Sequence, residues 1–165
     1  MSIISENEIE QFALEELQRQ GFQYLYGPFI APDGEQPERF DYHDVLLMGR
    51  LRNAVQKLNP RIPADAREAV VQKVLRIASP DLLHNNEGFH RYLVEKVKIP
   101  YQQNGYERSH EITLIDFEHP DNNEFLAVNQ YTIIENNQNK RPDVLLFVNG
   151  IPLVVMELKN PAEEN

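Results

Sequence analysis

The first twenty residues have apolar positions at helical spacing. Four of them fall on one stripe of a helix: Ile9, Phe12, Ala13 and Leu17. Ser5 is a suitable N-cap before this stripe, and Gly21 is placed to end the helix. An aromatic strand is expected over residues 22–26, followed by a loop over residues 31–41 that contains two prolines and a glycine.

The middle of the chain is also predicted to be helical. Apolar residues recur at helical spacing from Leu51 to Leu58, and the Asn-Pro pair at 59–60 ends that helix. A second helix is expected from Ala64 to Ala78, and a short third helix over residues 88–94. A group of helices therefore follows the first strand.

The last third of the chain changes to β-type patterns. We expect strands in residues 112–117 and 125–134, separated by turn-forming residues. Residues 144–148 and 151–159 form two more apolar, β-branched runs, joined by Asn149-Gly150. Asn-Gly between such runs is a strong local signal for a β-hairpin. The order of elements predicts an α/β fold.

Composition narrows the class of protein. The 165 residues include 26 acidic and 16 basic side chains, for a net charge of −10, yet residues 39–110 carry a net charge of +4. The chain has no cysteine, which excludes disulfides and thiolate sites. It contains no run long enough to span a membrane, no secretory leader and no P-loop, so we expect a cytoplasmic protein without an ATP site in this chain.

Candidate chemistry is concentrated around the last hairpin. In a strand, Glu157 and Lys159 project from one face, and the turn brings Asp143 back beside Glu157. Two carboxylates can hold one or two Mg²⁺ ions, and a lysine can neutralise negative charge during phosphodiester hydrolysis. The alternative is a plain salt bridge between Lys159 and one of the carboxylates at an exposed strand end.

The register of this hairpin decides between the two. A regular two-residue turn at 149–150 would place Asp143 opposite Met156 and turn Glu157 to the other face. A three-residue loop or a one-residue bulge would restore the pair of carboxylates, and Pro152, which cannot donate to a ladder, is a natural place for a bulge. We therefore predict an irregular hairpin.

These residues resemble a known motif. Asp143 with Glu157-Leu158-Lys159 resembles the PD-(D/E)xK nuclease motif. Longer blocks at 89–95, 115–130 and 141–161 are similar to the N-terminal nuclease region of type I restriction enzyme R subunits. The resemblance implies an α/β, PD-(D/E)xK endonuclease-like mixed sheet flanked by helices.

The resemblance also implies how the chain is divided. Residues 1–165 would form a single N-terminal nuclease domain without the motor domains. A basic helical insert would occupy about 44–96, and the sheet with the active-site hairpin about 111–160.

The family implies a Mg²⁺-dependent endonuclease, a type I site-specific deoxyribonuclease. Asp143 and Glu157 would be metal ligands and Lys159 the catalytic lysine. Glu10 on the first helix would complete the site, with Glu8 as the alternative. The partners would be double-stranded DNA and the methylation and specificity subunits, with ATP-driven translocation confined to the full-length protein.

The chain departs from the family pattern where it stops, at Asn165. In the family a helix with a Q-x-x-x-Y element usually follows the lysine. We therefore expect a fragment with weak or no activity, whose unpaired sheet edge forms a homodimer. Two alternatives stay open: a non-catalytic docking module of the same architecture, and a stand-alone junction-resolving nuclease, which would need a more basic surface.

Overall fold

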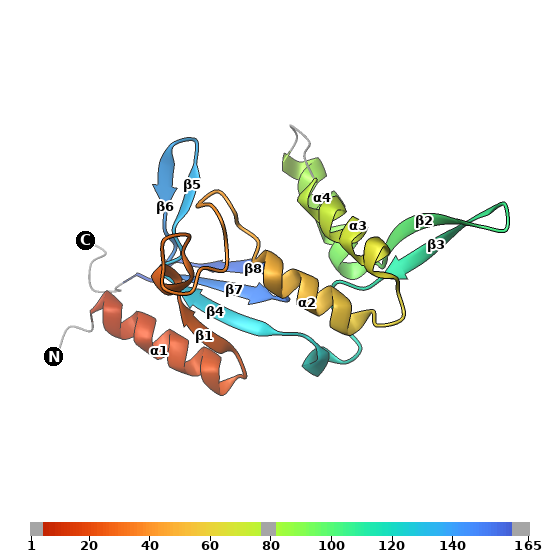
Figure 1. Cartoon of the computed structure of the whole chain (residues 1–165). Coiled ribbons are helices and arrows are strands. Elements are labelled where there is room, and N and C mark those ends of the chain that lie inside the picture. Colours follow the sequence, from red (N-terminus) through yellow and green to blue (C-terminus); the bar gives the residue numbers. More distant parts are fainter. Residues whose placement is uncertain (1–4, 77–81, 160–165) are drawn as a thin grey trace. The chain divides into compact units, whose positions relative to one another are not determined.

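A computed structural model describes residues 5–76 and 82–159 (Figure 1). The chain divides into two compact units. The first combines Met1–Met48 with Glu124–Asn165, and the second is Gly49–Asn123. The described residues form four α-helices and a mixed sheet, so the fold class is α/β.

The first unit is built on a four-stranded mixed sheet in the order β1-β4-β7-β8. Its strands are β1 (Gln23–Tyr26), β4 (Phe125–Asn129), β7 (Val144–Val148) and β8 (Ile151–Met156). β1 runs parallel to β4, and the other neighbours are antiparallel. Because of these directions, the last residues of β1, β4 and β8 and the first residue of β7 meet at one end of the sheet.

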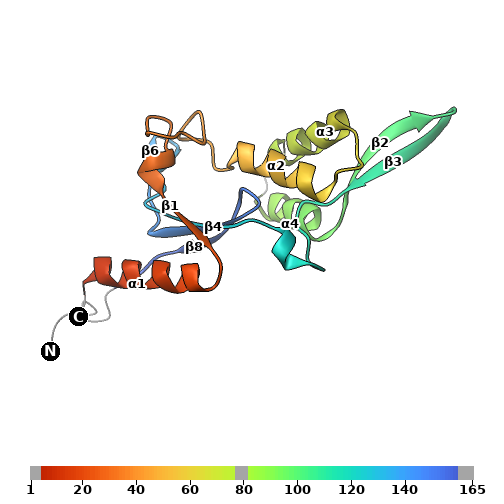
Figure 2. The ribbon, with the colours of Figure 1, turned by 60° about the horizontal axis from the view of Figure 1, so that its bottom comes forward.

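Both faces of this sheet are covered over β4 and β7. Helix α1 (Glu6–Arg19) lies along one face, where Leu14 packs against Ala127 and Val144 (Figures 1 and 2). The other face packs against the segment that follows β1, including the short 3₁₀ helix η1 (Gly27–Ile30). The buried residues of that second cluster are Ile30, Leu47, Leu126, Val128, Tyr131, Leu145 and Phe147. A small hairpin, β5 (Ile133–Glu135) with β6 (Gln138–Lys140), completes the unit.

In the part of it that the structure describes, the second unit has three helices and a hairpin. The helices are α2 (Met48–Leu58), α3 (Ala64–Leu75) and α4 (Leu82–Val94), and the hairpin pairs β2 (Val97–Gln103) with β3 (Tyr106–Ile112). A 3₁₀ turn, η2 (Pro120–Asn122), follows. Among the described residues, no helix has the length and apolar character needed to cross a membrane.

The first helix confirms the prediction at both ends. Ser5 and Glu8 form a capping box, and Gly21 follows the helix with φ of +97°. The predicted inward position of Phe12 is wrong, because its side chain is 63% exposed while Leu14 is 2% exposed. The buried face is therefore rotated toward Leu14, which the expected stripe did not include.

The strands agree with the prediction best near the C-terminus. Residues 144–148 are β7 as expected, and Asn149 and Gly150 both have positive φ, as a type I′ turn requires. β8 ends at Met156, three residues before the predicted end. The run over 125–134 is split between β4 and β5.

The strand predicted over residues 112–117 is wrong beyond Ile112. The backbone of Thr113 is held by the side chain of Asn59, and Asp116 accepts the backbone N–H groups of Glu118 and His119. Side chains thus take the bonds that a partner strand would have supplied. The strand pair β2–β3 was not predicted.

The helices of the second unit differ from the prediction in length. α3 ends at Leu75, and the last two residues of the predicted helix lie outside the described residues. α4 begins six residues earlier than expected. How the two units correspond to domains of a larger protein stays a prediction.

Candidate active site

The β7–β8 hairpin contains the predicted bulge. Near the turn, Val148 pairs with Ile151 and Phe147 with Pro152. Beyond a register shift, Leu146 pairs with Val154, Leu145 with Val155 and Val144 with Met156. Leu153, next to Pro152, is therefore the extra residue, and the irregular hairpin is confirmed. In the shifted register the next pair along the strands is Asp143 with Glu157.

Asp143 forms hydrogen bonds with the segment that follows β8 and with the residue that follows β4. Its Oδ2 accepts the backbone N–H of Leu158 at 2.6 Å, and its carbonyl accepts the backbone N–H of Gln130 at 3.1 Å. The first bond holds the backbone between Glu157 and Lys159 beside the Asp143 carboxylate. Both flanking side chains are exposed, and within the described part of the chain Lys159 forms no ion pair with either carboxylate. The salt-bridge alternative is thus not formed.

Glu10 reaches the same end of the sheet from α1. Its Oε1 accepts the side-chain amide of Asn129 at 2.6 Å, and its Oε2 accepts the amide of Gln130 at 3.0 Å. The Oδ1 of Asn129 accepts the hydroxyl of Tyr24 at 3.0 Å. Burial, together with the negative charge of Glu10, raises the pKa of Tyr24.

Glu8 has a structural role at the N-terminus of α1. Its carboxylate accepts the backbone N–H and the hydroxyl of Ser5, at 2.7 and 2.9 Å, and these bonds lower the pKa of Glu8. Glu8 therefore closes the capping box at the start of α1. The geometry favours Glu10 over Glu8, although a catalytic role for Glu10 stays a prediction.

The donor set suits a hard divalent cation but is only partly assembled. Asp143 and Glu157 offer carboxylate oxygens, the ligands that Mg²⁺ takes in proteins. Across residues 5–76 and 82–159, however, no three acidic or histidine side chains come close enough to hold a metal ion together. Glu10 and Asp143 are joined through Gln130, whose side chain donates to Glu10 and whose backbone N–H donates to the Asp143 carbonyl.

Sequence reasoning missed the residues that connect this network. Asn129 is 4% exposed, and Gln130 follows it with φ of +53°. A signal was present in the sequence, because two amide side chains directly follow the apolar run of β4. Polar residues at the end of a buried strand need partners, and here the partner is Glu10.

Two basic residues from the middle of the chain form hydrogen bonds with other residues of the second unit. Arg52 donates two hydrogen bonds of 3.0 Å to Glu68. These bonds, with one from Gln72, lower the pKa of Glu68 to about 2. Lys57 donates to the carbonyl of Asn122 at 2.8 Å. Arg52 and Lys57 are therefore engaged by groups of their own unit.

Comparison with known proteins decides the family. Residues 3–165 match the family model described as "Type I restriction enzyme R protein N terminus". The chain belongs to this family. The assignment to the N-terminal region of an R subunit, made from the motif blocks, is thereby confirmed.

Two curated relatives cover nearly the whole chain. The type I restriction enzyme HindI endonuclease subunit of Haemophilus influenzae is 42% identical over 164 residues, which is 99% of this chain and 16% of the relative. A putative type I restriction enzyme MjaIXP endonuclease subunit of Methanocaldococcus jannaschii is 33% identical over 156 residues, which is 93% of this chain and 15% of the relative. The chain thus spans about one sixth of the length of these relatives.

Proposed function

We propose that this chain is the endonuclease domain of a type I restriction enzyme R subunit, of the PD-(D/E)xK type, which hydrolyses DNA phosphodiester bonds with Mg²⁺. The observation that carries the proposal is the bulge at Leu153. It sets Asp143 and Glu157 in one register at the end of the sheet where Glu10 also arrives. Membership of the R-subunit family supports the same conclusion. The comparisons give no support to a stand-alone junction-resolving nuclease.

Each residue of the site has a role in this proposal. Asp143 and Glu157 would hold the Mg²⁺ ion, which offsets negative charge on the reacting phosphate when bound. Lys159 lies two residues after Glu157 and would stabilise charge that develops on the phosphate oxygens. Glu10 would add a third carboxylate and, through Asn129 and Gln130, fix the end of β4 beside Asp143.

The wider setting of this activity belongs to the proposal as well. In the full-length protein, cleavage of double-stranded DNA would be coupled to ATP-driven translocation by the motor domains, in a cytoplasmic complex with methylation and specificity subunits. A homodimer of the isolated chain would form through the edge strand β8, where Leu153, Val154 and Val155 are 40–64% exposed.

A non-catalytic docking module is the second candidate. It is favoured by the incomplete donor set in the described residues and by the hydrogen bond that Asp143 Oδ2 already accepts from Leu158. In that function Asp143 would serve only to hold the segment after β8 in place. The two candidates differ in whether a divalent cation binds at Asp143.

The test is a calorimetric titration of the chain with Mg²⁺ and Mn²⁺. Asp143→Ala is compared with wild type and with Asp121→Ala, an exposed acidic residue of the second unit. The nuclease proposal expects binding to wild type and Asp121→Ala and none to Asp143→Ala. Equal binding by all three contradicts it. If none binds, the same titrations in a full-length R subunit decide, and absence of Asp143-dependent binding there supports the docking module.

A further inference from the structure

Arg39 is a buried arginine with one unsatisfied edge. The residue is 4% exposed, and its Nη1 donates to the backbone carbonyl of Asp44 at 3.3 Å. Its Nε and Nη2 are buried and have no hydrogen-bond partner. No carboxylate of the described residues forms an ion pair with it. An unpaired cation in such a place is unfavourable unless a partner binds there.

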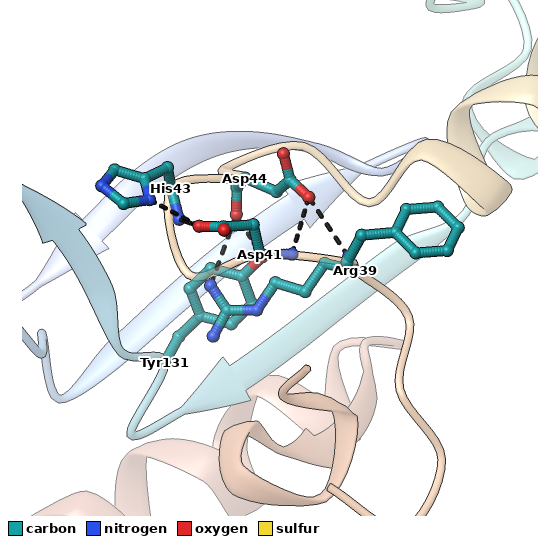
Figure 3. Close-up of polar contacts among 6 residues, drawn as sticks. Arg39, Asp41, His43, Asp44 and Tyr131 are labelled. Carbon is teal, nitrogen blue, oxygen red and sulfur yellow. Dashed lines mark hydrogen bonds and ion pairs between the residues drawn. The ribbon is translucent and has the colours of Figure 1, made fainter. Parts of the chain in front are cut away.

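Aromatic rings fix the plane of this guanidinium. Its central carbon lies 3.8 Å from the centre of the Tyr131 ring and 5.1 Å from that of Tyr42. In Figure 3 the guanidinium lies over Tyr131, with Nη1 directed to the Asp44 carbonyl and the opposite edge turned away from the loop that carries Asp41 and Asp44. The two unsatisfied nitrogens are therefore held in a fixed orientation.

The acidic residues of this loop are engaged elsewhere. The Oδ2 of Asp44 accepts the backbone N–H groups of Phe40 and Asp41, at 3.2 and 3.0 Å. The Oδ1 of Asp41 accepts the backbone N–H of His43 at 2.8 Å. Both carboxylates thus shape the loop and leave Arg39 without a carboxylate partner.

The unsatisfied edge has the geometry of an oxyanion receptor. Nε–H and one N–H of Nη2 lie parallel on the same side of a guanidinium, spaced to meet two oxygens of one phosphate or carboxylate. Arginine is the residue best suited to this two-bond recognition. Neither of these two nitrogens of Arg39 donates a hydrogen bond to another group of the described residues.

Arg39 also lines a cavity. The cavity has a volume of about 290 Å³, and its other lining residues are Gly27, Pro28, Ala31, Asp33, Tyr42, Gln130 and Thr132. This is at the lower end of the range for ligand pockets, so it suits a small anion rather than a nucleoside. Asp33 is the one acidic residue of the lining; it is exposed, and its carboxylate accepts the Tyr42 hydroxyl at 2.5 Å.

Gln130 connects this cavity with the candidate active site. Gln130 is among the residues that line the cavity, its side chain donates to Glu10, and its backbone N–H donates to the carbonyl of Asp143. A ligand in the cavity would therefore lie next to the end of the sheet where Asp143 and Glu157 are in register.

We propose that this cavity is a phosphate subsite in which Nε and Nη2 of Arg39 bind two oxygens of the anion. Because both nitrogens are covered in this structure, a side chain of the lining must move aside when the anion binds. The source of the phosphate rests on the proposed function: it is a backbone phosphate of DNA beside the one that is cleaved. Free phosphate is the other source of the same chemistry.

The test follows the Nε–H resonance of Arg39 by NMR during titration with inorganic phosphate in EDTA. The resonance should shift in wild type and in Arg19→Lys, an exposed arginine control from the same unit. Arg39→Lys keeps the charge but loses the pair of donors; followed through the backbone amide of Thr132, which lines the cavity, it should bind phosphate roughly tenfold or more weakly. Thr132→Val changes the lining of the cavity and leaves the guanidinium in place, and it should also weaken phosphate binding. This second variant provides the test if Arg39→Lys does not fold. An unmoved Arg39 resonance overturns the proposal.

A second titration identifies the source of the phosphate. A short DNA duplex in EDTA should shift the same resonance if a backbone phosphate enters the cavity. A response to inorganic phosphate without one to DNA overturns the DNA assignment and leaves a site for free phosphate. Since neither titration needs metal or cleavage, failure of the nuclease proposal and failure of this subsite give different results.

Discussion

Two polar clusters of the sheet unit, one partly buried and one around the buried Arg39, share Gln130 but differ in how their hydrogen bonds are satisfied. In the first, Glu10, Asn129 and Asp143 all have partners, at distances down to 2.6 Å. In the second, two donors of Arg39 have none. A satisfied network stabilises the fold, whereas buried donors without partners are retained at a cost in stability. The difference indicates that the cluster of Glu10, Asn129 and Asp143 stabilises the fold, whereas the cluster around Arg39 can accept a ligand.

The largest expected effect comes from Gly27, which packs against the end of β4. A Cβ at this position would lie 2.5 Å from the carbonyl oxygen of Asn129 and 2.8 Å from the backbone of Gln130. Gly27→Ala must therefore shift β4 and disturb both clusters, and should reduce the free energy of unfolding by about 3 kcal/mol. Urea denaturation measures this. Gly49→Ala, where nothing lies within 4 Å of the added carbon, is the control and should not destabilise.

Tyr131 links the arginine cluster to the pH dependence of stability. Burial raises the pKa of Tyr131 to about 12, above its ordinary value of 10.0. The folded state therefore holds this proton more tightly than the unfolded state, and stability that is present below pH 10 should be lost between pH 10 and 12. The loss should reach about 2–3 kcal/mol. Denaturation across this range should show it in wild type and not in Tyr131→Phe.

Asn129→Leu tests the satisfied cluster. The change removes the donor to Oε1 of Glu10, which keeps its bond from Gln130, and the acceptor for the Tyr24 hydroxyl, so two part-buried hydrogen bonds are lost. We expect a loss of about 2 kcal/mol in unfolding free energy. If Asn129→Leu is neutral, the network does not stabilise the end of β4.

Arg39→Met tests the unsatisfied cluster and should have the opposite sign. Methionine occupies similar space without the two unpaired donors, although the contact with the Tyr131 ring is weakened. The variant should be as stable as wild type or up to about 1 kcal/mol more stable, and should not bind phosphate. A destabilisation as large as that of Asn129→Leu would remove the distinction between the clusters.

Local chemistry explains what the sequence predicted correctly. The capping box at Ser5 and Glu8 and the Asn149-Gly150 turn depend on neighbouring residues, and the bulge beside Pro152 depends on one missing backbone donor. Each is visible within a few positions of the chain.

The failures depend on residues distant in sequence. The strand expected after Ile112 is replaced because Asn59 binds the backbone of Thr113. The burial of Arg39 could not be predicted from its neighbours in sequence, since the ring on which its guanidinium lies belongs to Tyr131, 92 positions away. The link between Glu10 and Asn129 likewise requires α1 to lie against the sheet, and no pattern in the sequence sets that distance.

The most direct measurement of the central claim is the broadening of backbone amide signals by Mn²⁺. If Asp143 and Glu157 share one cation because of the bulge at Leu153, the amide of Leu158 and those next to it should broaden first, followed by those near Glu10. Asp143→Ala should abolish the effect. Broadening centred instead on the acidic segment 116–121, or broadening at Leu158 that persists in Asp143→Ala, would contradict the account.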